Sequence, residues 1–199
     1  HDSIIALLEK YRILHRMGDR LIIPSMLPVA RPGHDISACF PSSIPASWNT
    51  VGRVFSFPSL PLGFFERLEV SLFNHPQLKI LLTWKRGLIM GGEDCKFFVE
   101  YEDTKYDLYI LFRYKLSTAS NSVPIYTSLL ATVGNMIFGF YPGLQECTKE
   151  SILCTHCIRR GVDNETSWRF DKKQIVQNLE GKSTDPMLHC NNMQGLSRA

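Results

Sequence analysis

The sequence lacks the motifs that would assign it directly to an enzyme class. Its 199 residues contain no G-x-x-x-x-G-K-[ST], G-x-G-x-x-G, H-E-x-x-H or G-x-S-x-G pattern, so the usual means of binding phosphates, holding a catalytic zinc or presenting a serine nucleophile are missing. His15, His34 and His75 stand singly in predicted hairpin or loop positions. Glu100 and Glu102 are two residues apart on a predicted strand, a spacing typical of a solvated edge. We predict no catalytic residue and no cofactor-binding residue in this chain.

The sequence also lacks a long apolar run and a signal peptide. No segment approaches the roughly 18 uninterrupted apolar residues of a membrane-spanning helix. The N-terminal HDSIIALLEKY does not have the basic-then-apolar order of a signal peptide. We therefore predict a cytoplasmic protein with no membrane span. Because the chain begins at His1 rather than at a methionine, we expect it to be a fragment of a longer polypeptide.

The charge of the chain is nearly balanced. The formal net charge is +3, from 22 basic and 19 acidic residues, whereas nucleic-acid-binding domains usually carry a clustered basic face. A nucleic-acid binder built on the N-terminal residues would have only Arg12, Arg16 and Arg20 in its hairpin as phosphate contacts. We predict that nucleic acid is not a partner.

Cysteine is too sparse for a disulfide-stapled secreted domain, since such domains are usually shorter and richer in cysteine. The six cysteines are Cys39, Cys95, Cys147, Cys154, Cys157 and Cys190. Cys154 and Cys157 form a C-x-x-C pair, a spacing that lets two thiolates bind one zinc ion from a tight turn. Cys147 and Cys190, with His156 as a substitute, are the candidate further ligands, but a second closely spaced pair is missing. A structural zinc site, a redox pair and plain reduced thiols all stay open.

What the chain does contain is a globular composition, with 44% apolar and 21% charged residues, which is enough for one large or two small domains. Residues 3–11 show helical spacing, and two short apolar strands follow around a Gly18-Asp19 turn. A helix followed by a hairpin is the closing half of a winged-helix unit. The predicted parts are residues 1–30 (helix and hairpin), 31–50 (a proline-rich linker), 51–145 (the main domain), 146–190 (a Cys-containing extension) and 191–199 (a disordered tail).

The main domain is predicted to be an antiparallel sheet covered by helices. The expected strands are residues 53–57, 84–90, 95–102 and 106–116, and the expected helices are residues 63–73 and 124–140. The turn-forming sequences GGED and EDTK separate the last three strands, which favours a meander. The helix at 124–140 has a broad apolar stripe that can cover one sheet face. The predicted class is α+β, preceded by the end of a winged-helix-like unit and followed by a small Cys-containing tail.

One face of this sheet has no assigned cover. Along residues 106–116 one side is fully apolar and the other is half apolar. The second side is covered by the helix at 63–73, or it forms an exposed patch of the kind that often marks a partner site. Core packing and partner binding are equally weighted explanations. The interface candidates are Phe98, Tyr109, Leu111 and the hairpin-tip residues Gly91, Gly92, Glu93 and Asp94.

Four segments of the chain carry a resemblance to a known family. They are LEKYRILHRMGDRLIIPSMLP, LPLGFFERLEVSLF, TWKRGLIM and IFGFYPGL. In this order and at these intervals they resemble the COR domain of Roco proteins, and within that family the leucine-rich-repeat kinases most closely. Each segment is short, but four in register are a specific signal. The resemblance covers residues 1–30, as the end of the first COR subdomain, and the second subdomain up to residue 145.

The resemblance implies a function without catalysis in this chain. COR is the region next to a Ras-like GTPase called Roc, and the second COR subdomain is a dimerisation device in the family. The chain resembles neither Roc nor a kinase, so GTP binding, GTPase and kinase activity would belong to domains outside it. The resemblance thus implies a homodimerisation and interaction module of an intracellular signalling protein, beside a Ras-like GTPase. A zinc-stapled adaptor that docks a different protein is the alternative.

Overall fold

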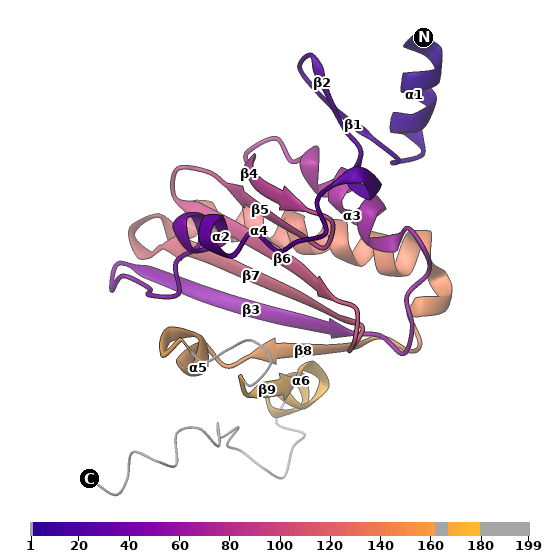
Figure 1. Ribbon diagram of the computed structural model, residues 1–199. Coiled ribbons are helices and arrows are strands. Elements are labelled where there is room, and N and C mark those ends of the chain that lie inside the picture. Colours follow the sequence, from indigo (N-terminus) through magenta and orange to yellow (C-terminus); the bar gives the residue numbers. More distant parts are fainter. Residues whose placement is uncertain (1, 162–166, 180–199) are drawn as a thin grey trace, which may run out of the picture.

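A seven-stranded antiparallel sheet forms the centre of the computed structural model (Figure 1), which describes residues 2–161 and 167–179. The strands are β3 (Trp48–Ser56), β4 (Lys79–Trp84), β5 (Gly87–Gly91), β6 (Cys95–Glu102), β7 (Asp107–Lys115), β8 (Lys149–Leu153) and β9 (Arg169–Asp171). Their order across the sheet is β4-β5-β6-β7-β3-β8-β9. The predicted α+β class with an antiparallel sheet is confirmed.

The N-terminal residues form the helix and hairpin that the sequence predicts. Helix α1 (Asp2–Lys10) is followed by strands β1 (His15–Met17) and β2 (Arg20–Ile22), which pair with each other in a separate two-stranded sheet. The remaining helices are η1 (Pro24–Met26), α2 (Gly33–Cys39), α3 (Phe64–Phe73), η2 (Leu116–Thr118), α4 (Ala119–Gly134), η4 (Pro142–Leu144), α5 (Thr155–Arg159) and α6 (Lys172–Leu179). A π-helical turn, Asn135–Phe140, extends α4.

Helices α3 and α4 both cover one face of the sheet. Alternation along β7 points Leu108, Ile110 and Phe112 to this face, where they join one buried cluster with the apolar stripes of the two helices. Of the two alternatives for the second face, cover by the helix at residues 63–73 is therefore wrong. Two short segments that the sequence analysis did not assign as covers protect that second face instead.

The second face is covered by α2 and α5. Ile36 of α2 and Phe40, which follows it, pack with Ile158 of α5 in a second buried cluster, and Figure 1 shows α2 in front of the sheet and α4 behind it. The stretch 31–50 is therefore not simply a linker. Its three prolines and scattered apolar residues concealed a seven-residue helix, because periodicity is not detectable over so few residues.

Two cations on the sheet hold the end of α2. Lys96 donates from Nζ to the carbonyl oxygen of Cys39 at 2.6 Å, and Arg113 donates from Nη1 to the carbonyl oxygen of Pro41 at 2.7 Å. The two residues are direct cross-strand partners on β6 and β7. Positive charge at the C-terminal end of a helix is favourable, since the last carbonyl groups lack partners inside the helix. This contact fixes a helix that buries little surface of its own.

The stretch predicted as one strand, residues 84–90, is a tight hairpin. Trp84 ends β4, Gly87 begins β5, and the two are paired across the turn. A Cβ atom on Gly87 would lie 1.9 Å from the Trp84 ring, so only glycine lets the indole pack over the turn. The turn also creates a strand that the sequence analysis missed, β4, whose exposed Lys79 and Leu81 and half-buried Leu82 give it a weak apolar pattern.

The C-terminal strands belong to the same sheet as the main domain, because β8 pairs with β3 and β9 pairs with β8. Arg169 of β9 ties this end to the second face, since Nη1 donates to Asp107 Oδ2 at 2.8 Å and Nη2 donates to the Tyr109 hydroxyl at 2.6 Å. The residues from 146 onward that the structure describes therefore do not form a separate extension.

We expect the substitution Arg169→Met to lower the free energy of unfolding by about 2 kcal/mol, because it leaves the buried Asp107 carboxylate without its cation. Urea denaturation measures this change. Arg160→Met, at an exposed position after α5, is the control and should change the free energy by less than about 0.5 kcal/mol. Equal effects of the two substitutions would show that the contact with Asp107 contributes nothing.

Candidate interaction surface

The three apolar interface candidates are part of the core. Phe98 and Tyr109 are 3% exposed and Leu111 is 6% exposed, because α2 and α5 lie over this face. The Phe98 and Phe40 ring centroids are 5.5 Å apart. The expectation of an exposed patch at these residues is therefore corrected. Core packing, the alternative explanation, accounts for all three.

The hairpin tip between β5 and β6 is accessible. Gly92 and Glu93 are exposed, whereas Gly91 is buried against Leu81. Asp94 accepts a hydrogen bond from Lys115 Nζ at 2.7 Å, and this bond holds the pKa of Lys115 above its ordinary value. A fixed, charged tip of this kind can contact a partner, and its role in an interface stays a prediction.

The C-x-x-C pair lies at the start of α5, where β8 ends. Cys154 precedes the helix and Cys157 lies within it. Both are buried, and together they form a small cluster against Trp168 and Phe170. Aromatic and apolar neighbours are the setting of structural thiols rather than of reactive ones, which sit in exposed, electropositive places.

The other two proposed zinc ligands do not complete a site in the described structure. Cys147 is exposed, and its thiol lies 3.4 Å from the carbonyl oxygen of Gly143. Cys190 lies outside the described residues. Among the residues that the structure describes, no three His, Cys, Asp or Glu side chains converge as a metal site. The donor set is therefore incomplete there, and zinc binding stays a prediction.

The histidines at the edge of the fold show structural roles. The His15 ring packs on Phe73, with 5.5 Å between the ring centroids, and burial lowers the pKa of His15 while the charge of Glu9 partly opposes this. Burial also lowers the pKa of His75, whose Nδ1 accepts the backbone N–H of Gln77 at 3.3 Å. A neutral imidazole in an aromatic or backbone contact is a packing group.

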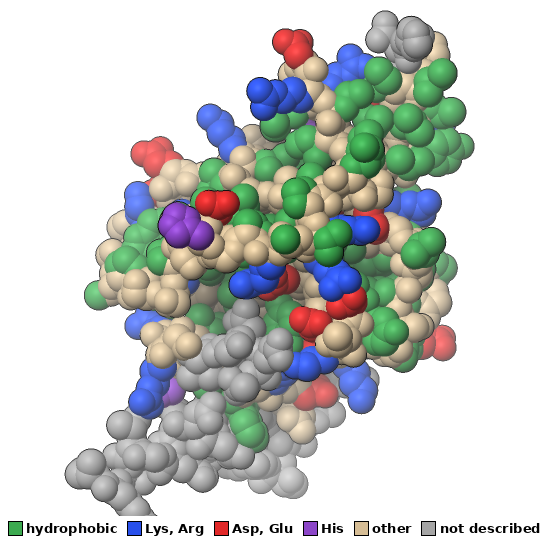
Figure 2. All heavy atoms as spheres, in the orientation of Figure 1, with side chains coloured by type: hydrophobic (Ala, Val, Ile, Leu, Met, Phe, Trp, Pro, Cys, Tyr) green, Lys and Arg blue, Asp and Glu red, His purple; other side chains and the backbone are tan. Residues whose placement is uncertain are grey.

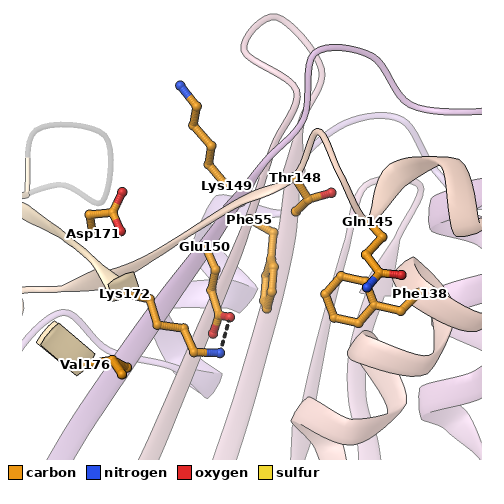
Figure 3. Close-up of a pocket in the computed structure, with 9 residues that line it drawn as sticks. All are labelled: Phe55, Phe138, Gln145, Thr148, Lys149, Glu150, Asp171, Lys172 and Val176. Carbon is orange, nitrogen blue, oxygen red and sulfur yellow. Dashed lines mark hydrogen bonds and ion pairs between the residues drawn. The ribbon is translucent and has the colours of Figure 1, made fainter. Parts of the chain in front are cut away.

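A hollow with a volume of about 590 Å³ lies between the end of α4 and the last strands (Figure 3). Phe55 forms its floor, Phe138 faces Phe55 across it, and Glu150 lies beside Lys172. The Glu150 carboxylate is held by two cations, because it accepts from Arg53 and, at 2.6 Å, from Lys172 Nζ. A carboxylate in two ion pairs is committed to holding the strands together and is not placed as a catalytic base.

A surface that the sequence analysis missed lies on the outer side of α4. We define the α4 outer face as Val123, Thr127, Ala131, Asn135 and Phe138, which follow one another at spacings of three or four residues and are all exposed. The opposite side of the helix, at Leu129, Val133, Met136 and Ile137, is fully buried. An outer face at helical spacing is ordinarily where a surface helix carries its charges.

The α4 outer face carries no charge. From Leu116 to Gln145 the sequence contains no Asp, Glu, Lys or Arg, although much of this stretch is exposed. The Thr127 hydroxyl donates to the Val123 carbonyl oxygen within the helix at 3.0 Å, which leaves the threonine methyl group to face outward. Such a surface can meet another uncharged surface at a small desolvation cost. The signal in the sequence was this charge-free stretch, which was interpreted only as a cover for the sheet.

The same helical stretch, Leu116–Phe140, is long and apolar enough to cross a membrane by length and composition alone. It is the one such stretch in the described residues. Its inner side is part of the main buried cluster, which is how a core helix of a globular domain passes the same criterion. Its other side, the α4 outer face, is exposed.

Figure 2 shows a second apolar area, over α1 at the N-terminal end of the molecule. Ile4, Leu7 and Tyr11 of this segment are 62%, 51% and 56% exposed, although their spacing is that of the buried side of a helix. The helix therefore packs weakly on the rest of the described chain. Its position depends on contacts at the helix end.

Comparison with known proteins relates the chain to Roco-type kinases at low identity. It is 28% identical over 170 residues to the probable serine/threonine-protein kinase pats1 of Dictyostelium discoideum, covering 79% of this chain and 5% of that protein. It is 25% identical over 183 residues to the probable serine/threonine-protein kinase roco7 of the same organism, covering 85% of this chain and 7% of that protein. No protein-family model matches the chain. The chain thus spans a small fraction of the length of the relatives that it matches.

Proposed function

We propose that this chain is a non-catalytic dimerisation and interaction module of a Roco-type intracellular signalling protein, corresponding to the COR region beside a Ras-like GTPase. The observation that carries the proposal is the similarity to two Roco-type kinases over 79% and 85% of this chain. Three of the four motifs that resemble COR lie in the seven-stranded sheet and the helices that cover it, and the first motif forms the N-terminal helix and hairpin. GTP binding and kinase activity belong, in this proposal, to domains outside the chain, and the module works in the cytoplasm.

The α4 outer face supports self-association as the role of the module. In a two-fold symmetric contact the same patch serves both copies, so a charged residue near the axis meets its own like charge. A face without charges avoids this repulsion. The α4 outer face runs from Val123 to Phe138, a contact line of about 24 Å at 1.5 Å per residue. The sheet face originally considered for this role is covered by α2 and α5.

A charge placed in the middle of this face tests the proposal. We expect Ala131→Glu to weaken the dimer at least tenfold, because each copy would bring an unpaired carboxylate into the contact. Sedimentation equilibrium of the 199-residue chain over ~1–100 µM measures the dissociation constant. A dimer whose dissociation constant lies above this range would be mostly dissociated throughout it. A chain that is monomeric throughout this range contradicts the proposal.

A matched pair of valines controls for the general effect of a surface charge. Val123, on the α4 outer face, is 56% exposed, and Val29, in the loop between η1 and α2, is 62% exposed. Val123→Glu should weaken the dimer, whereas Val29→Glu should not. Equal effects would place the contact elsewhere on the molecule.

Mixing complementary variants tests the two-fold symmetry directly. Ala131→Glu and Ala131→Lys should each self-associate at least tenfold more weakly than the unsubstituted chain, and together they should form a heterodimer, because opposite charges then meet across the axis. Failure of the mixture to associate, with both variants folded, would mean that the α4 outer face does not pair with its own copy.

A further inference from the structure

The joint between α1 and β1 has an unusual backbone. Arg12 has a φ of +57°, a left-handed conformation that residues with a Cβ atom rarely adopt. The hydrogen bonds around it define the cause. The Arg12 N–H donates to the Glu9 carbonyl oxygen and the Ile13 N–H donates to the Leu8 carbonyl oxygen, both at 2.9 Å. This is the Schellman pattern of helix termination, in which glycine is the usual residue at the left-handed position.

Arginine at the left-handed position costs conformational energy in the turn, and strain of this kind persists only where other contacts of the residue offset it. The guanidinium carbon lies 4.4 Å from the centre of the Phe140 ring, a cation–π distance. Nη1 lies 3.9 Å from the Met136 sulfur. Both partners belong to the π-helical turn Asn135–Phe140 that extends α4. One strained residue therefore joins two parts of the fold that are 124 residues apart in sequence.

Two structural features allow the π-helical turn to shift when the N-terminal unit moves. A π-helical turn interrupts the regular hydrogen bonding of a helix and is often found at functional sites. Phe138, within this turn, is 45% exposed and ends the α4 outer face. On the other side of the joint, Ile4 and Leu7 of α1 are more than half exposed, so burial of α1 does not fix its position.

We propose that Arg12 is a clamp that couples the N-terminal unit, residues 2–22, to the π-helical turn at the end of α4. Because the turn carries Phe138, release of the clamp changes the shape of the α4 outer face, and this consequence rests on the proposed dimerisation. The clamp is a positioning contact and takes no part in chemistry. A partner that displaces the N-terminal unit would thereby weaken self-association.

Hydrogen exchange of the whole chain tests the clamp independently of dimerisation, in an Ala131→Glu background at low protein concentration. Arg12→Gly keeps the left-handed turn, since glycine adopts it freely, and removes the side chain. We expect at least tenfold faster amide exchange in residues 2–22 and also in residues 135–140. The amides of β6 and β7 should exchange at unchanged rates.

Two further variants separate a clamp from a simple helix terminator. Phe140→Leu should accelerate exchange in the same two regions, and the double variant should add nothing to either single one, as expected for two residues of one contact. Arg12→Lys keeps the charge but loses the planar group that stacks on the ring, so it should give an intermediate acceleration. If Arg12 only ends α1, Arg12→Gly will leave exchange unchanged or slow it, and the proposal is overturned.

The dimer constant then tests the consequence for the α4 outer face. With Ala131 restored, Arg12→Gly and Phe140→Leu should each weaken the dimer at least threefold. Faster exchange with an unchanged dimer constant would overturn the coupling to the face. If the unsubstituted chain is monomeric, the proposed function fails, and the exchange rates in residues 135–140 still decide whether the clamp exists.

Discussion

Replacing Glu69 by glutamine is expected to raise the free energy of unfolding at pH 7 by about 3 kcal/mol. Glu69 lies on α3 and is 0% exposed. One carboxyl oxygen accepts from the Thr83 hydroxyl at 3.3 Å, and the other has no hydrogen-bond partner among the described residues. Burial raises the pKa of Glu69 from 4.5 to about 9, the Thr83 hydrogen bond opposes the shift, and the charge of Glu66 adds to it.

The effect depends on pH with a definite sign. Between pH 4.5 and about pH 9 the folded protein keeps a proton on Glu69 that the unfolded chain has lost, so stability falls as pH rises through this window. Because pH 7 lies about 2.5 units above the lower end of this window, the protein has lost about 3 kcal/mol of its free energy of unfolding there, at 1.36 kcal/mol per unit. Glutamine does not titrate, and its side-chain oxygen can still accept the hydrogen bond that the Thr83 hydroxyl donates to Glu69. The gain should therefore grow from less than about 1 kcal/mol at pH 5 toward its full value at pH 9.

Urea denaturation at pH 5, 7 and 9 measures this difference for both proteins. Glu66→Gln, three residues earlier on the same helix, is the control and should change the free energy of unfolding by less than about 1 kcal/mol, the usual size of a charge effect in the first turn of a helix. A gain in Glu69→Gln that is the same at all three pH values would show that the Glu69 carboxyl is not held neutral.

Arg113→Ala is expected to have the opposite effect and to lower the free energy of unfolding by about 3 kcal/mol. Arg113 is 5% exposed. Nε donates to the Thr50 hydroxyl at 3.1 Å, Nη1 donates to the Pro41 carbonyl oxygen at 2.7 Å, and the guanidinium lies 4.1 Å from the centre of the Phe40 ring. Burial lowers the pKa of Arg113 to about 10, so the group stays charged at neutral pH.

The two substitutions differ in sign because they leave different groups behind. Glu69→Gln replaces a carboxyl that is neutral in the folded protein and removes only the ionisation that stabilises the unfolded chain, so stability rises. Removing Arg113 leaves the Thr50 hydroxyl and the Pro41 carbonyl unpaired, each at about 1–3 kcal/mol, and also opens space beside Phe40. These losses exceed the recovered cost of burying one cation.

The expected change in Arg113→Ala is local as well as global. Without its anchor, α2 should show faster hydrogen exchange than β6 and β7. Arg113→Lys keeps the charge but supplies one compact donor group in place of the planar guanidinium. Its free energy of unfolding should therefore lie between those of the unsubstituted protein and Arg113→Ala. Arg20→Met, at an exposed position on β2, is the control and should change stability by less than about 0.5 kcal/mol. An alanine variant as stable as the control would mean that α2 is held by apolar contacts alone.

Strands and helices with several turns of clear periodicity could be predicted from the sequence. The strand Cys95–Glu102 was predicted with the bounds that the structure shows, and the helix at 63–73 differs by one residue. The N-terminal helix and hairpin were also found, because a Gly-Asp turn separates two apolar runs. The Trp84–Met90 error had a local cause, since a two-residue turn between apolar residues leaves the alternation almost undisturbed.

The candidate site was predicted less well, and the reason is again physical. Phe98, Tyr109 and Leu111 were placed on the correct face of the sheet, but their accessibility depends on segments far away in sequence. The α4 outer face was overlooked because an apolar stripe indicates which side of a helix is buried and gives no account of the other side.

The sequence by itself determined the α+β class, the antiparallel pairing in the centre of the sheet and the identity of the main buried stripe, because these follow from alternation and helical spacing within one segment. Only the tertiary structure decided that α3 and α4 share one face, that α2 and α5 close the other, and that the last strands extend the same sheet. Each of these depends on which distant segment fills a given apolar surface. Packing between elements decides which segment it is, and short segments such as α2 and β9 have too few residues for their position to be predicted from the sequence.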